Sequence, residues 1–335
     1  MFHSHDPLGP TESRTVNGRS GRRLAIIPQR HWIGLLSAAI ACTAATVVVT
    51  PVGAQDLEPR AYANTPVGLN FLLVGYSFST GSVLTDASLP IVDGKVDAHA
   101  AVLAYVRSFG VWGKSAKLQL VLPAATASGS ATFDGEPMDR TVTGLADPRL
   151  RVSVNLLGAP AQTLEQFRSY RQGTILGTSL QITVPMGQYD RNKLLNLGTN
   201  RWSFKPELGL SRAWGPFTLE FAGAAVLYTD NNDFLGGNKR EQAPLYSLQV
   251  HAIYSLKGGV WLAVDATYYI GGTTTVDGVE NDDQQSSTRL GGTLALPLGR
   301  YHSLKLYGSS GVFARTGTSF DTIGVVWQYR WGAGL

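Results

Sequence analysis

The chain has 335 residues and a formal net charge of +4, and 16% of its residues are charged, against about a quarter in ordinary proteins. Its mean hydropathy is nevertheless close to zero, so apolar residues are interspersed with polar ones, which argues against a bundle of membrane-spanning helices. The first 54 residues hold five arginines, one Asp and one Glu, and without them 23 basic residues balance 22 acidic ones. The basic isoelectric point therefore gives no support for nucleic acid as a partner.

The chain begins with a predicted signal peptide, residues 1–54. An apolar run from Trp32 to Val49 follows a set of arginines that ends at Arg30, and the small residues Val52 and Ala54 predict cleavage after Ala54. The alternative is a membrane anchor, since a run of this length can span a bilayer, although its Ala and Thr content makes it weakly apolar. Cys42, the single cysteine, lies in this leader, so the mature chain has no disulfide or thiol chemistry.

Behind the leader, the pattern is all-β and indicates a transmembrane antiparallel β-barrel of about 12 strands. We expect residues 55–66 to form an N-terminal periplasmic or plug segment, residues 67–331 the barrel, and residues 332–335 a C-terminal tail. The predicted strands are Val67 to Thr80, Val96 to Phe109, Ala116 to Thr126, Pro148 to Leu157, Thr174 to Met186, Asn200 to Trp214, Phe217 to Thr229, Pro244 to Leu256, Val260 to Ile270, Gln285 to Leu298, Ser303 to Arg315 and Ser319 to Trp331.

The connections between these strands alternate between long and short, as expected of a barrel with long outer loops and short inner turns. Long connections include Ala127 to Asp147, Asp230 to Ala243 and Gly271 to Gln284, and the acidic residues of the last one lack the ligand spacing of a calcium loop. One inner connection, Gly158 to Gly173, is also long. Within it, residues 163–170 begin with an N-cap residue and predict either a short helix or an irregular loop.

The stretch from Asp147 to Pro160 is predicted to form a strand with one apolar face and one polar face. Leu150 and Val152 share one side with further apolar residues, while Arg149 and Arg151 share the other, because strand side chains alternate. With an inner N-terminus this is the fourth strand and runs inward. The two arginines are then expected in the outer half of the lumen.

If the apolar phase of every strand meets lipid, the polar phase builds the interior. A lipid-facing Arg or Lys at the midplane costs about 2–4 kcal/mol, so the shared phase of the charged residues indicates the lumen. We interpret them mainly as ion pairs that brace the barrel, with selection of solutes by the excess positive charge as the alternative. The lumen-lining candidates are Asp97, His99, Arg107, Lys117, Arg149, Arg151, Lys205, Glu207, Glu220, His251, Asp265, Arg289, Lys305, Arg315 and Arg330.

The mature chain offers no constellation of residues for catalysis. Its histidines are His99, His251 and His302, and neither of the first two has a serine two residues later on the same strand face. Gly-x-Ser-x-Gly is absent, and three scattered histidines do not make a metal cluster. We therefore predict no enzyme, no catalytic residue, no metal and no cofactor.

Three stretches carry a resemblance to a known family. Asp147 to Pro160 reads Asp-Pro-Arg-Leu-Arg-Val-Ser-Val-Asn-Leu-Leu-Gly-Ala-Pro, and together with Leu180 to Asp190 and Asn200 to Glu207 it resembles the family of the MetA-pathway of phenol degradation. The resemblance implies a barrel in the bacterial outer membrane, of a kind often described as a transporter, and passage of phenols or other aromatic compounds. It carries no catalytic residues over.

These observations lead us to expect a passive outer-membrane channel for small hydrophobic or aromatic solutes. Twelve strands predict a lumen narrower than that of porins, which residues 55–66 could close by folding inside. The alternative is a closed structural barrel whose outer loops bind partners. A lipid-modifying enzyme is a third and weaker alternative.

Overall fold

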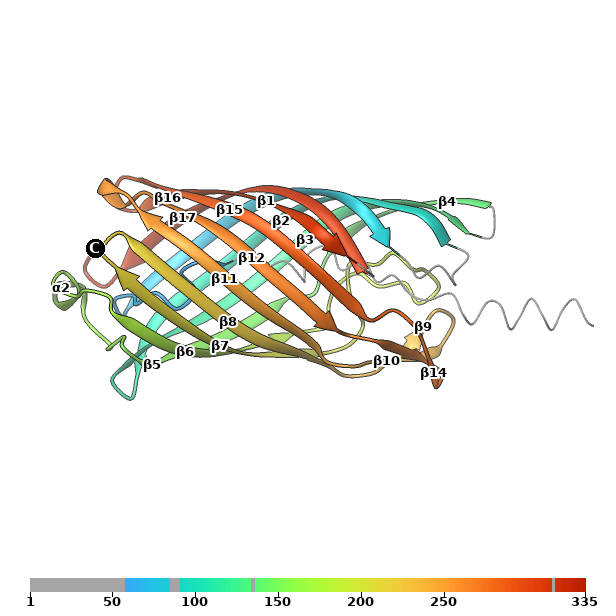
Figure 1. The fold of residues 1–335 in the computed structure, drawn as a ribbon, viewed down its shortest axis with the longest axis horizontal. Coiled ribbons are helices and arrows are strands. Elements are labelled where there is room, and N and C mark those ends of the chain that lie inside the picture. Colours follow the sequence, from blue (N-terminus) through green and yellow to red (C-terminus); the bar gives the residue numbers. More distant parts are fainter. Residues whose placement is uncertain (1–57, 85–90, 134–135, 315–316) are drawn as a thin grey trace, which may run out of the picture. The chain divides into compact units, whose positions relative to one another are not determined.

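The computed structural model describes residues 58–84, 91–133, 136–314 and 317–335, so the predicted signal peptide lies outside the described residues. Strands dominate this part of the chain (Figure 1). None of its helices has the length and apolar character needed to cross a membrane.

The wall is a closed barrel of twelve antiparallel strands, which confirms the predicted fold class. Its strands are β1 (Leu69–Leu84), β2 (Ile91–Val111), β3 (Lys114–Phe133), β5 (Arg149–Leu157), β6 (Thr174–Thr183), β7 (Ser203–Trp214), β8 (Phe217–Tyr228), β11 (Leu245–Ser255), β12 (Trp261–Gly271), β15 (Gln285–Leu298), β16 (His302–Ala314) and β17 (Gly317–Gly332). Each strand pairs with its neighbour in sequence, and β1 pairs with β17 from Leu69↔Gly332 to Leu84↔Gly317. The strands cross the barrel at a marked tilt, as closure requires (Figure 1).

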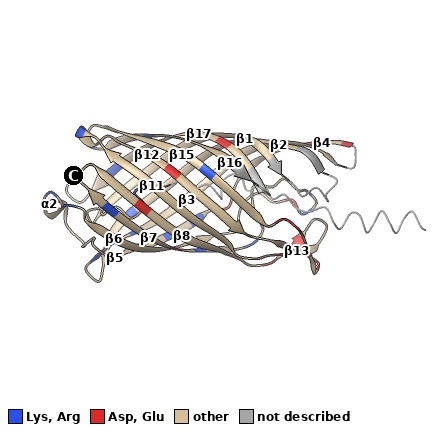
Figure 2. Ribbon diagram, viewed as in Figure 1, with Lys and Arg blue, Asp and Glu red and all other residues tan. Residues whose placement is uncertain are grey.

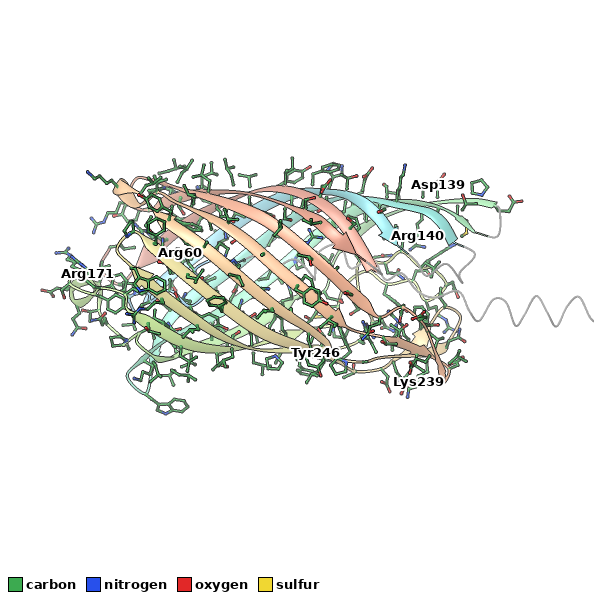
Figure 3. The ribbon with its side chains drawn as sticks, viewed as in Figure 1. Arg60, Asp139, Arg140, Arg171, Lys239 and Tyr246 are labelled. Carbon is green, nitrogen blue, oxygen red and sulfur yellow. The ribbon has the colours of Figure 1, made fainter. Side chains whose placement is uncertain are left out.

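The two ends of the barrel differ. One end carries the C-terminus and the helix α2 (Leu164–Phe167), and we call it the inner end (Figure 1). The 3-10 turn η2 (Lys257–Gly259) joins β11 to β12. The outer end carries a second, four-stranded sheet of β9 (Asn231–Phe234), β10 (Asn238–Gln242), β13 (Thr274–Val276) and β14 (Val279–Glu280). Figure 3 shows Arg171 and Lys239 at these opposite ends. The sequence predicted this second sheet only as two long loops.

The predicted short helix is present as α2, and its start is capped on both sides. Thr163 Oγ1 accepts a hydrogen bond from the Gln166 amide at 3.3 Å, and Gln166 Oε1 accepts one from the Thr163 amide at 3.0 Å. This reciprocal pair satisfies two amides that a helix start would otherwise leave without partners.

Residues 127–147 differ from the prediction, which made them a loop. β3 continues to Phe133 and pairs with β4 (Glu136–Leu145), from Ala124↔Leu145 to Phe133↔Glu136. β5 then takes over the pairing on β3 at Val121↔Arg149, so β4 and β5 are two parts of one interrupted wall strand. Small and hydroxylated residues in this stretch led to the prediction of a loop. On the paired strands their hydroxyl groups form hydrogen bonds with one another, as those of Ser128 and Thr141 do at 3.0 Å.

An apolar cluster fills part of the outer half of the barrel. Leu195 and Leu197, from the connection between β6 and β7, are 8% and 5% exposed. They belong to one cluster with small wall residues, and a Cβ on Gly129 of β3 would lie 3.1 Å from Leu195. The wall members are Val96, Ala98, Ala100, Ala125, Ala127, Val142, Ala146 and Phe320. We call the connection, residues 184–202, the inserted loop.

Candidate functional site in the barrel lumen

The side chains on the two faces of β5 differ in their exposure. Arg149 and Arg151 are each 9% exposed, whereas Leu150 and Val152 are 37% and 40% exposed. Apolar residues on the outward face of neighbouring strands are similarly exposed, for example Leu103 at 46%. An apolar outer face of this kind suits contact with lipid, and the polar phase of β5 points inward.

Most of the charged candidates lie on the inward face. All but Lys205 are either buried or line the cavity described below, and Lys205 is half-buried beside Glu207. Figure 2 shows charged residues of both signs along the strands as well as at the ends. The candidates on the inward face are Lys117, Arg149, Arg151, Lys205, Glu207, Glu220, His251, Asp265, Arg289, Lys305 and Arg330. Arg315 lies outside the described residues.

Three candidates on β2 were assigned to the wrong face. Asp97, His99 and Arg107 are exposed on the outward side, in the same phase as Leu103, and the inward phase consists of small residues such as Ala98 and Ala104. The charges of β2 fall in one phase, and the prediction took that phase as the lumen face, whereas the small apolar phase faces inward.

Their positions along β2 explain why an outward charge is tolerated. Asp97 and His99 lie toward the outer end of a strand of 21 residues, longer than the roughly 9–11 that cross the hydrocarbon. Asp97 accepts a hydrogen bond from Thr80 at 2.5 Å, and His99 Nδ1 lies 2.7 Å from the Tyr76 hydroxyl. Arg107 is near the inner end, where a long side chain can reach the headgroups.

Residues 58–66, which we call the N-terminal segment, contact the inward face of the inner half. Tyr62 is 4% exposed, and its ring lies against two glycines, Gly177 of β6 and Gly209 of β7. A Cβ at either glycine would come within 2.2 or 2.1 Å of a ring atom. The Tyr62 hydroxyl donates to Glu207 Oε1 at 2.8 Å. The two glycines thus form a seat for Tyr62.

Charged and polar side chains of the wall also hold the backbone of the N-terminal segment. Lys117 Nζ donates to the Ala61 carbonyl at 2.9 Å, and Glu220 Oε2 accepts from the Arg60 amide at 2.7 Å. Ser108 Oγ donates to the Pro66 carbonyl at 2.5 Å. These bonds satisfy backbone groups that the barrel interior would otherwise leave without partners.

An ion-pair network surrounds the Tyr62 seat. Arg151 Nη2 lies 2.6 Å from Glu207 Oε1 and its Nη1 lies 3.1 Å from Glu58 Oε2, while Lys205 Nζ lies 3.4 Å from Glu207 Oε2. Removing a charge from water is costly unless the charge finds a partner of opposite sign. Removing one residue of a pair therefore leaves the other as an uncompensated buried charge. The network therefore links the N-terminal segment to β5 and β7.

His251 and Asp265 form a second buried pair, with His251 Nδ1 2.6 Å from Asp265 Oδ1, and Thr293 donates to the other carboxylate oxygen at 3.2 Å. Among the described residues, neither His251 nor His99 has a serine hydroxyl as a hydrogen-bond partner. The same part of the chain contains no group of three metal-ligating side chains. His251 points inward and His99 outward, so the two are not parts of one site.

A cavity of about 410 Å³ lies between the N-terminal segment and the wall of the inner half. Its lining combines apolar side chains, such as Phe71 and Trp261, with Lys117, Lys305 and Arg330. We call it the inner cavity. It has the size and the mixed lining of a site for a small organic molecule.

Asp147 fastens the inserted loop in the outer half. Its Oδ1 accepts from the Gly187 amide at 2.8 Å, and its Oδ2 accepts from both the amide and the hydroxyl of Thr199 at 2.8 Å. Gly187 and Gly198 lie back to back, and a Cβ on Gly198 would be 2.7 Å from the Gly187 carbonyl oxygen. Two of the three quoted sequence stretches therefore meet at this clamp, and the third begins at Asn200, next to Thr199. Sequence reasoning missed this role.

Two buried arginines lie next to the inserted loop at the outer end. Arg201 and Arg240 are 4% and 5% exposed, and their guanidinium groups stack on Tyr228 and Phe234 at 4.4 and 5.4 Å. Arg201 Nη2 donates to Gln242, but Arg201 Nε and Nη1 and Arg240 Nε have no hydrogen-bond partner among the described residues. Burial and the nearby positive charge of Arg201 lower the pKa of Arg240 to about 9.

Comparisons with known proteins agree with this geometry. A family model described as "Putative MetA-pathway of phenol degradation" matches residues 77–325. The fold is similar to that of an outer membrane channel from Pseudomonas putida F1, with a TM-score of 0.71 and 22% identity over 82% of this chain and 100% of that one. No curated protein matches significantly.

Two further solved barrels are more distant. The transport unit of the autotransporter AIDA-I from Escherichia coli has a TM-score of 0.49 and 10% identity, over 88% of this chain and 97% of that one. The CymD monoaromatic hydrocarbon channel has a TM-score of 0.41 and 10% identity, over 84% of this chain and 93% of that one.

Proposed function

Because the chain belongs to the family of the MetA-pathway of phenol degradation, we propose that it is a passive channel of the bacterial outer membrane for small aromatic solutes. The observation that carries this proposal is the inner cavity inside a barrel with an apolar outer face. A volume of about 410 Å³ accommodates a single-ring compound. The name of the channel from Pseudomonas putida, whose fold this chain shares, is consistent with the same role.

In this proposal the N-terminal segment closes the inner half of the lumen. Tyr62 in its glycine seat, with the ion pairs around Arg151 and Glu207, holds the segment against β6 and β7. All of these contacts are non-covalent, and within the described part of the chain the segment leads into the wall at Leu69, where β1 begins. Displacement of the segment toward the inner end would widen the passage without disturbing the barrel.

The test of the channel proposal is flux through the purified full-length protein in liposomes. We expect phenol to equilibrate faster across liposomes that contain the protein than across empty liposomes, with a rate proportional to the protein content. A rate equal to that of empty liposomes, from protein that has folded as a barrel, would contradict the proposal. Heat-modifiable migration in electrophoresis supplies the folding control.

A second candidate function is a closed barrel whose outer sheet binds a partner. The observation in its favour is that both the N-terminal segment and the inserted loop occupy the interior. This candidate predicts no flux even when the N-terminal segment is displaced, whereas the channel proposal predicts a rise. We propose no catalytic role, and among the described residues the hydrogen-bond partners of His251 and His99 include no serine hydroxyl.

A further inference from the structure

The charge around the inner cavity is unbalanced. Five basic residues line it, namely Arg60, Lys117, Arg151, Lys305 and Arg330, against one acidic residue, Glu58. Glu58 is already paired with Arg151 at 3.1 Å. The carboxylate on the cavity wall is therefore engaged, and a net positive charge faces the cavity.

Three of these cations make no ion pair with a carboxylate among the described residues. Lys117 Nζ has the neutral carbonyl of Ala61 as its partner, and Arg330 Nε donates to the carbonyl of Arg300 at 2.8 Å. Lys305 lies on β16 opposite Val326 and lines the same cavity. All three side chains are half-buried and have N–H groups that could donate to a carboxylate, and an anion brought into the cavity would accept these charge-assisted hydrogen bonds.

The outer end has the same imbalance. Arg201 and Arg240 are buried with three N–H groups that have no partner among the described residues. The nearby carboxylate of Asp147 is engaged by the inserted loop, and that of Asp283 by Thr274. The outer end therefore also holds buried guanidinium groups that form no ion pair with a carboxylate among the described residues.

We propose that the inner cavity binds small aromatic carboxylates, with Lys117, Lys305 and Arg330 facing the carboxylate and Phe71, Val106 and Trp261 facing the ring. This inference rests on the proposed channel function and names the class of its solute. The apolar members of the lining suit a ring, and the charge-assisted bonds that carboxylates accept from Lys and Arg are the strong ones. A neutral aromatic compound would offer these cations no carboxylate.

The experiment measures binding of benzoate and of neutral benzamide, which has a similar shape, to the purified full-length barrel by equilibrium dialysis. We expect benzoate to bind at least tenfold more tightly than benzamide. Lys305→Gln should weaken benzoate binding about tenfold and leave benzamide binding unchanged, and Arg330→Gln should do the same. The matched control is Lys257→Gln, at an exposed lysine of the inner turn η2, which should change neither affinity.

Equal affinity for benzoate and benzamide in the unaltered protein would overturn the inference, and so would benzoate binding that both cavity variants retain. Complete displacement of benzoate by an equal concentration of chloride would also overturn it, because the site would then take any small anion. Failure of the channel proposal is distinguishable, since it appears as absent phenol flux whatever the benzoate affinity.

Discussion

The inner and outer halves of the lumen are both occupied, but by segments that are held in different ways. In the inner half, Tyr62 rests in a glycine seat and a network of ion pairs surrounds it. In the outer half, the inserted loop continues into β6 and β7 at its two ends, packs on an apolar wall and is clamped by Asp147. From this difference we propose that the inner occupant is displaceable, whereas the outer one stays fixed against the wall.

The largest expected effect tests the assignment of faces on which this comparison rests. Val152→Arg would place a charge on the outward face of β5, at a cost of about 2–4 kcal/mol near the midplane. We expect it to impair assembly into outer membranes severely. Ser153→Arg, on the inward face beside the inner cavity, should assemble far better, and equal assembly of the two variants would mean that the faces are reversed.

A second change addresses the outer half. Asp147→Asn keeps the shape of the clamp but removes its charge and replaces one accepting oxygen by an NH2 donor, so at least one of the three hydrogen bonds from Gly187 and Thr199 is lost. We expect limited trypsin digestion of the native barrel to cut the inserted loop at Lys193 severalfold faster. The control is Asp139→Asn on β4, an exposed position at the outer end, where the rate should not change (Figure 3).

A smaller effect is expected from the inner half. Tyr62→Phe keeps the ring in its seat but removes the hydroxyl that donates to Glu207 at 2.8 Å. A hydrogen bond to a charged group contributes about 1.5–3 kcal/mol, so the segment should leave its seat more often. In planar-bilayer recordings, the Tyr62→Phe variant should open more often than the unaltered protein. Unchanged opening frequency would mean that the hydroxyl does not hold the segment.

The smallest effect is expected at α2, which lies outside both halves. Thr163→Ala removes one side of the capping box and should lower helix stability by about 1 kcal/mol. We expect no change in conductance or in loop cleavage. A change in either would show that the inner connection takes part in closing the lumen.

The sequence predicted the barrel well because lipid on one side and a polar lumen on the other impose a period of two on each strand. The same rule failed for Asp97, His99 and Arg107, since the inward face of β2 is built from small apolar residues that pack under the inserted loop. A charge is a reliable marker of the lumen only within the hydrocarbon, and β2 extends beyond it.

The seat of Tyr62 could not be predicted, because no local pattern links it to glycines more than 100 residues away in sequence. A partial signal existed for the Asp147 clamp. The three stretches that carried the family resemblance contain Asp147, Gly187 and the residues next to Thr199, but a likeness in sequence does not reveal which of them touch.

The central claim is that the N-terminal segment closes the inner half through the glycine seat, and single-channel conductance of two glycine variants tests it most directly. A Cβ at Gly209 would lie 2.1 Å from the Tyr62 ring, whereas a Cβ at Gly223 on the neighbouring strand β8 meets nothing within 4 Å. Overpacking by a larger side chain costs about 1–3 kcal/mol, and here the cost falls on the state in which Tyr62 is seated. A cost of about 2 kcal/mol raises the ratio of open to closed channels more than tenfold. We predict that the Gly209→Val variant spends far more time open than the unaltered protein. The Gly223→Val variant should behave like the unaltered protein. Equal conductance of both variants, with both barrels folded, would contradict the account.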